Sequence, residues 1–443
     1  MMRKFLFCLL FLSMSSIFGQ GGTETRILSM RDRAQLRDAW LETRFQTVLP
    51  EVMRRHKIDM WVIIAREYNE DPVIKTMQPA TWISSRRRTI IVFFDQGPEK
   101  GIERLAVARY DIGKLIKGAW EKEKQPDQWK RLAEIITERD PKKIALNYSS
   151  TFPLGDGVTM TEYKAFENSL SASLRKRIVS GEMLAVGWLE RRTPQEMEVY
   201  KNINALAHEI IEEGFSSSVI QPGFTTTKDV EWWYRERIRE LKLVTWFHPS
   251  VSIQRRDNSE LRTSFSSKPS SKVIHRGDLL HVDFGINYLG LNTDTQRHAY
   301  VLRLGETEPP AGLKKALAVG NRLQDILLSN YAVGRTGNEI LLKSLKQAKS
   351  EGIVPSIYTH PIGFHGHAAG MTVGMWDSQG GVPGKGDYKL FPRTAYSIEL
   401  NVTVSIPEWD NKKIKIMLEE DAYFGEDSID YISGRATELI IVH

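Results

Sequence analysis

Apolar residues in the first half of the chain follow two patterns, helical spacing and short continuous runs. Helical spacing covers residues 31–57 and 129–137. Apolar runs of strand length cover residues 60–65, 89–94, 105–110 and 144–148. Strands that alternate with helices predict an α/β domain whose partly parallel sheet is covered on both faces.

A sharp helix start follows Glu190. Thr193 can cap this helix, Pro194 suits its first turn, and Glu196 can reach back to the cap. An apolar stripe then continues until Gly214, which suits the end of a helix. Since the pattern changes here, we place a domain boundary between residues 21–189 and residues 190–443.

The C-terminal half contains segments in which apolar residues follow a period of two. In residues 280–285 and 414–419, apolar side chains alternate with polar ones, so each segment has one apolar face and one face that carries an acid. His281 shares the polar face with Asp283 and is a candidate for supporting it. This pattern predicts an α+β domain in which one sheet face carries polar chemistry.

The bulk composition is that of an ordinary globular protein. The chain has 443 residues, of which 41% are hydrophobic and 26% charged, and this length predicts two or three domains. The net charge of +6 comes from basic residues scattered among acidic ones, and no basic stripe with interleaved aromatic residues is present. Nucleic acid is therefore not an expected partner.

Residues 1–20 have the pattern of a secretory signal peptide. Arg3 and Lys4 form a charged start, an apolar core follows, and small residues lead to Gly19. We expect a secreted or periplasmic protein with no membrane segment after the signal is removed, because no other stretch approaches membrane-spanning length. The only cysteine, Cys8, lies within this signal. Any metal in the mature chain must therefore be held by Asp, Glu and His.

Four acidic residues occur within predicted strands. Asp283 lies in an apolar strand, and Asp294 follows eleven residues later across a turn rich in Asn and Gly. A hairpin would place both carboxylates on one face, where their repulsion favours a divalent cation between them; the alternative is that both lie in turns and face water. Glu399 lies in another apolar run, and Glu419 or Glu420 in a further one. Carboxylate-rich sets with one imidazole suit pairs of Mn²⁺, Co²⁺ or Zn²⁺.

The hairpin sequence DFGINYLGLNTD at residues 283–294 carries a family resemblance. It resembles the D-x-G-x-x-y-x-G-y-x-x-D hairpin of the family that contains methionine aminopeptidase, aminopeptidase P, prolidase and creatinase. The resemblance covers residues 190–443 and implies a pita-bread metallopeptidase domain there. More weakly, residues 21–189 resemble the α/β N-terminal domain of aminopeptidase P and creatinase.

The resemblance implies a dinuclear metal site. In the family, Asp283 would bind one ion and Asp294 would bridge both. The later acids would be Glu399 and Glu419, with Glu420 as the fallback for the latter. Two divalent ions are expected, manganese first and cobalt or zinc as alternatives.

The histidine ligand of the family lies in a G-H-G-x-G motif. Three histidines occur within eight residues here, namely His360, His365 and His367. His367 matches the motif best, because Gly366 precedes it and Gly370 follows at the right offset, and His365 is the alternative ligand. We expect His360 and His365 to act as catalytic residues beside the metal ions.

The substrate side of the site departs from the family pattern. Positions that hold histidines in the family hold other residues here. These replacements are Ser266 or Ser267, Gly363 and Trp376. The resemblance therefore supports the metal cage more strongly than the identity of the substrate.

The activity implied by the resemblance is that of an Xaa-Pro aminopeptidase on short peptides. A hydroxide that bridges the two ions would attack the carbonyl, and Glu399 would transfer the proton. The family also implies a homodimer. Two alternatives are hydrolysis of a non-peptide amide, as in the creatinase branch, and a secreted metal-binding pseudoenzyme.

Overall fold

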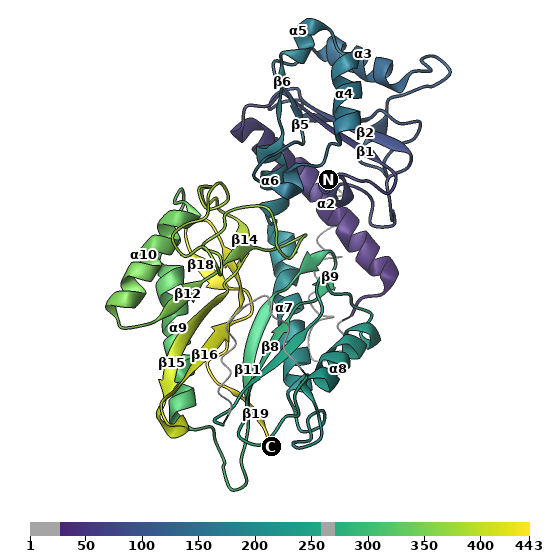
Figure 1. Ribbon diagram of the computed structural model, residues 1–443. Coiled ribbons are helices and arrows are strands. Elements are labelled where there is room, and N and C mark those ends of the chain that lie inside the picture. The colour runs from purple at the N-terminus through teal and green to yellow at the C-terminus, as the bar shows by residue number, and fades with distance from the viewer. Residues whose placement is uncertain (1–26, 258–270) are drawn as a thin grey trace, which may run out of the picture.

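The structure is a computed structural model that describes residues 27–257 and 271–443. The predicted signal peptide, together with Ser266 and Ser267, lies outside the described residues. Figure 1 shows a smaller N-terminal part above a larger C-terminal part. No helix among the described residues is long and apolar enough to cross a membrane.

A six-stranded mixed sheet forms the centre of the N-terminal part. Its strands are β1 (Met60–Arg66), β2 (Arg88–Asp95), β3 (Ile102–Ala106), β4 (Lys117–Gly118), β5 (Ile144–Leu146) and β6 (Ile178–Ser180). The spatial order is β4-β3-β2-β1-β5-β6, with β1 antiparallel to β2 and parallel to β5. The α/β prediction for this part is confirmed, although the third strand ends at Ala106 rather than continuing to Tyr110.

Helices cover both faces of this sheet. They are α2 (Met30–Arg55), α3 (Gln128–Arg139), α4 (Met160–Ser169), α5 (Ala172–Arg175) and α6 (Glu182–Glu190), with the short 3-10 turns η2 (Ile74–Thr76) and η3 (Pro153–Gly155). Trp61 and Ile63 of β1 share a core with Val52 of α2, while Val62 between them shares a separate core with Leu132 of α3. Because alternate residues point to opposite faces, a strand covered on both sides is apolar throughout.

The chain passes into the C-terminal part through a short break after α6. Helix α7 (Pro194–Gly214) begins with the expected capping box, in which Thr193 and Glu196 satisfy each other's backbone N–H groups. Between the two helices, Arg191 forms an isolated β-bridge with Thr394. We propose this break as the boundary between the two domains.

Three sheets and two helix pairs form the C-terminal part. The strands are β7 (Ser250–Gln254), β8 (Leu279–Phe284), β9 (Asn287–Tyr288), β10 (Leu291–Asn292), β11 (Thr295–Val301), β12 (Pro355–Ile357), β13 (His360–Pro361), β14 (Thr394–Ser397), β15 (Leu400–Ile406), β16 (Lys412–Leu418), β17 (Asp421–Phe424), β18 (Ile429–Tyr431) and β19 (Ile440–Val442). The sheet orders are β19-β11-β8-β7, β12-β15-β16 and β13-β14-β17-β18, and β9 pairs with β10 in a small hairpin.

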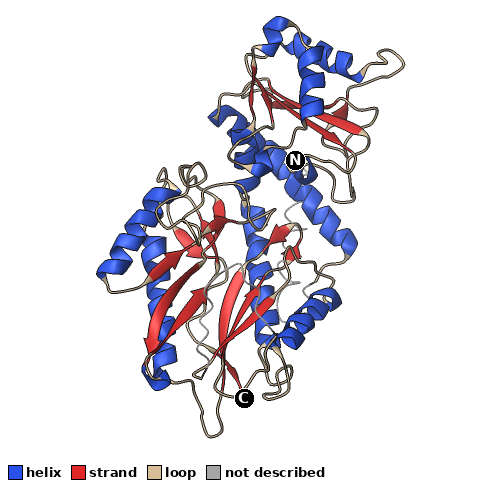
Figure 2. Ribbon diagram, in the orientation of Figure 1, coloured by secondary structure: helices blue, strands red, loops and turns tan. Residues whose placement is uncertain are grey.

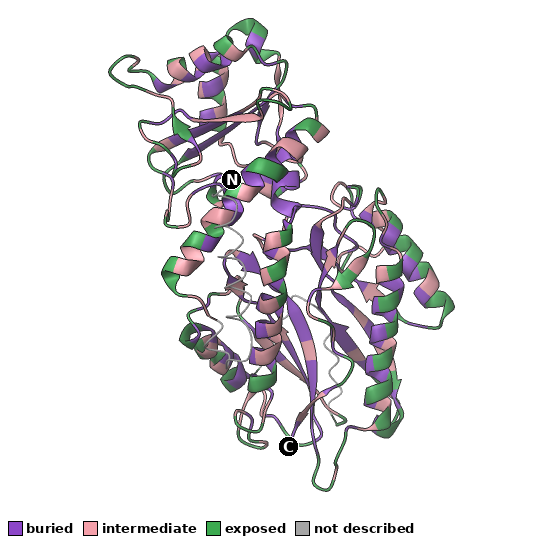
Figure 3. Cartoon of the chain, turned by 180° about the vertical axis from the view of Figure 1, so that it is seen from behind, coloured by how far each residue is buried: buried purple, intermediate pink, exposed green. Residues whose placement is uncertain are grey.

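The remaining helices cover the outer sides of these strands. They are α8 (Thr227–Glu240), α9 (Ala311–Ser329) and α10 (Gly337–Ser350), with the 3-10 turn η4 (Pro407–Trp409). Helix α7 packs on α8, and α9 packs on α10 and β15, so the strands lie between two helix pairs (Figure 2). Most strand residues are consequently buried (Figure 3).

Candidate metal centre

The four predicted acids come together where the sheets of the C-terminal part meet. Asp283 lies near the end of β8, as expected. The other three were predicted within strands, and this detail is wrong. Asp294 directly precedes β11, Glu399 lies between β14 and β15, and Glu419 lies between β16 and β17. At these breaks the chain passes from one sheet to another, which directs the side chains into the space that the sheets enclose.

Six side chains at this junction form three overlapping groups with the spacing of metal ligands. Within each group, one ligand atom from each residue lies within 4.8 Å of the others. The groups are Asp283, Asp294 and Glu419; His360, Glu399 and Glu419; and Asp294, His360 and His367. Asp294, Glu419 and His360 each belong to two groups, so the three groups form one connected cluster.

His360 lies deeper in this cluster than His367. It is buried, and its Nε2 lies 3.5 Å from both Asp294 Oδ2 and Glu419 Oε1. Its Nδ1 lies 3.0 Å from the carbonyl oxygen of Pro361 and can donate to it, which leaves the Nε2 lone pair free when the ring is neutral. The geometry therefore favours His360 as the imidazole ligand.

His367 lies at the open edge of the same cluster. It is exposed, and its ring packs edge-on against His360, with the ring centres 4.6 Å apart. On another side it packs against Trp246 at 5.1 Å. A side chain at Gly366 would collide with the Trp246 ring. The glycine before His367 thus permits the close packing that fixes this histidine.

His365 does not belong to any ligand group among the described residues. It lines a separate cavity, and its Nδ1 has no hydrogen-bond partner within the described part of the chain. Burial, together with the nearby charges of Arg192 and Lys75, lowers the pKa of His365 to about 4. His365 is therefore a neutral ring beside the metal cluster rather than a member of it.

The electrostatics of the cluster favour a bound cation. Burial raises the pKa of Asp294 and Glu399, and the neighbouring carboxylates, Glu419 first, raise these pKa values further. Burial opposes the charged form of His360, but the carboxylates of Glu419 and Glu399 outweigh it and raise the pKa of His360. Asp294 Oδ1 and His360 Nε2 are buried without hydrogen-bond partners among the described residues. Since such atoms are normally paired, the donor set fits divalent metal ions.

A fifth acid, Asp421, lies against the cluster and was not among the predicted residues. It is buried, and its Oδ2 accepts a hydrogen bond of 3.2 Å from the backbone N–H of Asp294. Burial raises the pKa of Asp421, and the charges of Glu419 and Glu420 add to this effect. The sequence offered one signal for this residue: it begins the strand that directly follows the predicted ligand.

Gln296 was also missed, although it contacts two predicted ligands. Its Nε2 donates to Glu419 Oε2 at 2.7 Å and to Glu399 Oε1 at 3.0 Å. His281 Nε2 lies 2.9 Å from Gln296 Oε1, so His281 can donate and fix the orientation of the amide. His281, which was predicted as a support for Asp283, contacts Gln296, the strand partner of Asp283 across β8 and β11.

Glu420, the fallback ligand, points away from the cluster. Its carboxylate pairs with Arg297 at 2.9 Å and His208 at 3.0 Å, and it accepts a hydrogen bond from the Ala436 N–H. Adjacent residues of an extended chain face opposite ways. Glu419 therefore lies at a candidate ligand position, whereas Glu420 belongs to a structural ion pair.

Two of the substrate-side positions that depart from the family pattern, Trp376 and Gly363, do not belong to any ligand group among the described residues. Trp376 is an exposed residue of the loop between β13 and β14. Gly363 leaves room for Arg192, whose guanidinium carbon lies 3.1 Å from where a side chain would begin. A side chain at this position would require the Arg192 guanidinium to shift by a few tenths of an ångström.

Comparisons with known proteins identify the family and the fold. The model of Metallopeptidase family M24 matches residues 198–426, while a search of curated proteins found no significant match. The fold is similar to X-Pro aminopeptidase from Thermotoga maritima, at 17% identity and a TM-score of 0.61, covering 88% of this chain and 100% of that one. It is also similar to Xaa-Pro dipeptidase from Bacillus anthracis, at 17% identity and a TM-score of 0.60, covering 90% and 99%. The chain thus has the pita-bread fold and belongs to metallopeptidase family M24.

Proposed function

We propose that this protein is a dinuclear metal-dependent aminopeptidase that hydrolyses short peptides at Xaa-Pro bonds. The observation that carries the proposal is the overlap of the three ligand groups through shared residues. Asp283 belongs only to one group and Glu399 only to another, while Glu419 belongs to both. Such an arrangement suits two ions that share carboxylates.

The ligand groups indicate which residues would hold each ion. Asp283, Asp294 and Glu419 would hold the first, and Glu399 and His360 would complete the second together with the shared carboxylates. This assignment gives His360 the role that the sequence resemblance gave to His367. Manganese is the proposed metal, with cobalt or zinc as alternatives. When bound, divalent ions lower the pKa of water and polarise a carbonyl.

Three protein side chains would transfer the proton, contact the substrate carbonyl and hold the carboxylates in place. Glu399, whose pKa burial raises, is suited to accept the proton of the attacking water and pass it to the leaving nitrogen. His367 lies exposed at the edge of the cluster, where its ring can donate a hydrogen bond to the attacked carbonyl. Gln296 would hold Glu399 and Glu419 in place through its two hydrogen bonds.

The preference for Xaa-Pro bonds is supported by the printed names of the structures with the same fold. One is an X-Pro aminopeptidase and another an Xaa-Pro dipeptidase. The test is hydrolysis by the purified chain, supplied in turn with Mn²⁺, Co²⁺ or Zn²⁺, of matched Xaa-Pro and Xaa-Ala peptides. We expect release of the N-terminal residue from the Xaa-Pro peptides, at least tenfold faster, and loss of activity with a chelator. Absence of cleavage of either peptide with every metal would refute the proposal.

We also propose that the chain is exported and forms a homodimer. Export is supported by the signal-like residues 1–20, and N-terminal sequencing of protein from its native cell should find a start near Gln20 or Gly21. Dimerisation rests on family resemblance alone, and light scattering of the purified protein tests it. An intact Met1 in native protein, or a monomeric mass, would contradict the respective proposal.

A further inference from the structure

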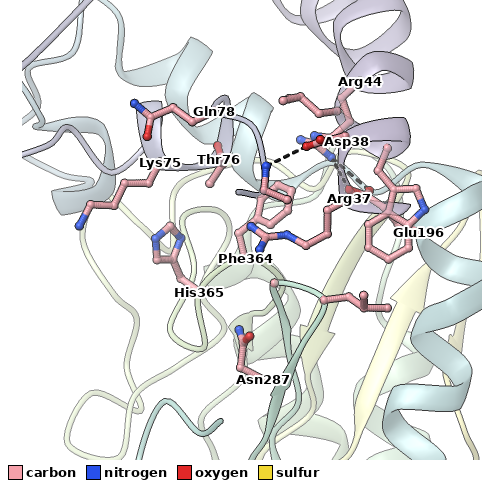
Figure 4. Close-up of a pocket in the computed structure, with 15 residues that line it drawn as sticks. Arg37, Asp38, Arg44, Lys75, Thr76, Gln78, Glu196, Asn287, Phe364 and His365 are labelled. Atoms are coloured by element: carbon pink, nitrogen blue, oxygen red, sulfur yellow. Dashed lines mark hydrogen bonds and ion pairs between the residues drawn. The ribbon is translucent and has the colours of Figure 1, made fainter. Parts of the chain in front are cut away.

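A cavity of about 240 Å³ lies between α2 and the η2 segment on one side and the C-terminal part on the other. From the C-terminal part it is lined by the β9–β10 hairpin and by Phe364 and His365. In Figure 4, Arg37 extends from α2 towards Phe364 and His365, and Lys75 comes from the facing segment. The cavity is separate from the metal cluster, since none of its lining residues belongs to a ligand group.

The charged residues of this cavity include two cations, Arg37 and Lys75, that are only loosely paired. Arg44 is buried in an ion pair of 3.1 Å with Glu196, and Asp38 accepts a hydrogen bond from the backbone N–H of Ala80. Arg37 has no hydrogen-bond or ion-pair partner among residues 27–257 and 271–443, although the charge of Asp38 acts on it, and Lys75 forms an ion pair of 3.9 Å with Glu70. The lining residues nevertheless carry a net positive charge, because three cations (Arg37, Arg44 and Lys75) face two carboxylates (Asp38 and Glu196).

Buried nitrogen atoms without hydrogen-bond partners are a second feature that favours an acceptor ligand in this cavity. Three lining residues each have a buried side-chain nitrogen without a hydrogen-bond partner in the described part of the chain: Trp40 Nε1, Arg44 Nε and His365 Nδ1. Trp40 Nε1 and Arg44 Nε are N–H donors, and His365 Nδ1 is one in one tautomer of the neutral ring; buried donors are normally satisfied by protein, water or ligand. Cations together with unpaired N–H groups suit an anionic ligand with several acceptor atoms, such as a carboxylate.

Two chain segments connect the cavity with the metal cluster. His365 lines the cavity and His367 belongs to the cluster, and two residues of chain separate their Cα atoms by at most about 7 Å. Asn287, which also lines the cavity, donates to Asn292, two residues before Asp294. An extended peptide advances about 3.4 Å per residue. A peptide held at the cluster can therefore reach the cavity within a few residues.

We infer that this cavity binds the free C-terminal carboxylate of a short peptide substrate, with Arg37 and Lys75 as its cationic partners. The inference rests on the proposed peptidase function and extends it to substrate length. Arg37 offers a planar fork that matches a carboxylate, and Lys75 adds a point charge on the other side. The enzyme would accordingly favour peptides of three or four residues over longer chains or chains that lack a free terminus.

The test is equilibrium binding of three tripeptide analogues to the full mature chain supplied with Mn²⁺. All are based on Ala-Pro-Xaa with the scissile amide reduced to a methyleneamine, so that no hydrolysis occurs. The first has a free carboxylate, the second is a C-terminal amide, and the third is an amide with an Asp side chain at Xaa. We expect calorimetry to show the free carboxylate binding at least tenfold more tightly than either amide.

The double variant Arg37→Gln/Lys75→Gln should lose this preference, to twofold or less, with unchanged affinity for the neutral amide. Arg31→Gln, an exposed arginine on the same helix outside the cavity, should keep it. Equal affinities in the wild type, or a preference that survives the double variant, would overturn the inference. Equal binding of the acidic amide would overturn its assignment to the chain terminus.

Hydrolysis of the unmodified Ala-Pro-Xaa peptides separates this inference from the proposed function. A carboxylate preference in binding without any cleavage would refute the peptidase function and leave the carboxylate site supported. Cleavage without a preference would support the function and refute the carboxylate site. The two proposals therefore fail in different measurements.

Discussion

The side-chain amide of Gln296 donates a hydrogen bond of 2.7 Å to Glu419, the acid that belongs to two ligand groups. The same nitrogen donates to Glu399 at 3.0 Å, and His281 can hold the amide in this orientation by donating to its Oε1. One uncharged residue thus restrains two carboxylates that would otherwise repel each other. Outer partners of this kind commonly matter for metal affinity nearly as much as the ligands do.

Replacing Gln296 by leucine should weaken metal binding without unfolding the chain. Leucine has a similar size but no donor, so Glu399 and Glu419 would lose their shared restraint. We expect metal affinity to fall about 10- to 100-fold, measured by competition with a chelator of known affinity. Gln347→Leu on α10, a helix that contributes no residue to the ligand groups, is the matched control. An unchanged affinity in Gln296→Leu would show that the amide has no influence on the ligands.

The three histidines should separate in their effects on metal content. His360→Ala should lose the most metal, because its Nε2 lies 3.5 Å from two cluster carboxylates. His367→Ala should retain most of the metal but lower turnover about 10²-fold or more, by analogy with loss of one carbonyl-stabilising donor. His365→Ala should retain all the metal. Elemental analysis and steady-state kinetics measure both effects, and greater metal loss in His367→Ala than in His360→Ala would restore the assignment made from the sequence.

Alanine at the two adjacent glutamates should have opposite consequences. Glu419→Ala should abolish metal binding and activity, whereas the metal-free variant should be no less stable than the metal-free wild type, because a repelling buried carboxylate is gone. Glu420→Ala should retain the metal but lose about 3 kcal/mol of unfolding free energy, since it leaves Arg297 without its buried partner. Urea unfolding and metal analysis distinguish the two, and the reverse pattern would place Glu420 in the cluster.

The stability of the protein should fall as the pH rises through neutrality, in part because of Glu190. Burial raises the pKa of Glu190 to about 7 from an ordinary value of 4.5. The folded chain therefore holds this proton more tightly than the unfolded chain, and its contribution to stability is present below pH 4.5 and is lost as the pH approaches and passes 7. The difference amounts to roughly 3 kcal/mol at pH 8.

Glu190→Gln should remove this pH dependence. The amide oxygen can still accept the hydrogen bond from Tyr388, which is 2.9 Å long in the wild type. We expect the variant to be more stable than the wild type at pH 8 and similar at pH 4, by urea unfolding at a series of pH values. Glu198→Gln, an exposed position on α7, is the control. Parallel pH profiles for the wild type and Glu190→Gln would contradict the assignment.

Local pattern was sufficient to predict much of the fold. The capping box at Thr193 and Glu196 is present as expected, because its hydrogen bonds join residues three apart. The two cores on either side of β1 follow from a strand that is apolar on both faces. The hairpin motif at residues 283–294 was specific enough to indicate the family, whose model matches residues 198–426.

The sequence by itself predicted which residue types a metal centre would contain: because the only cysteine, Cys8, lies in the expected signal peptide, carboxylates and imidazoles were the expected ligands. Only the tertiary structure decided which of them converge. His360 and His367 are seven residues apart, yet their rings lie 4.6 Å from each other, while His365 between them faces another cavity. Gln296 acquires its role only because Glu399 and Glu419 reach it from more than 100 residues away. Periodicity describes neighbours along one element, whereas these contacts depend on how three sheets meet.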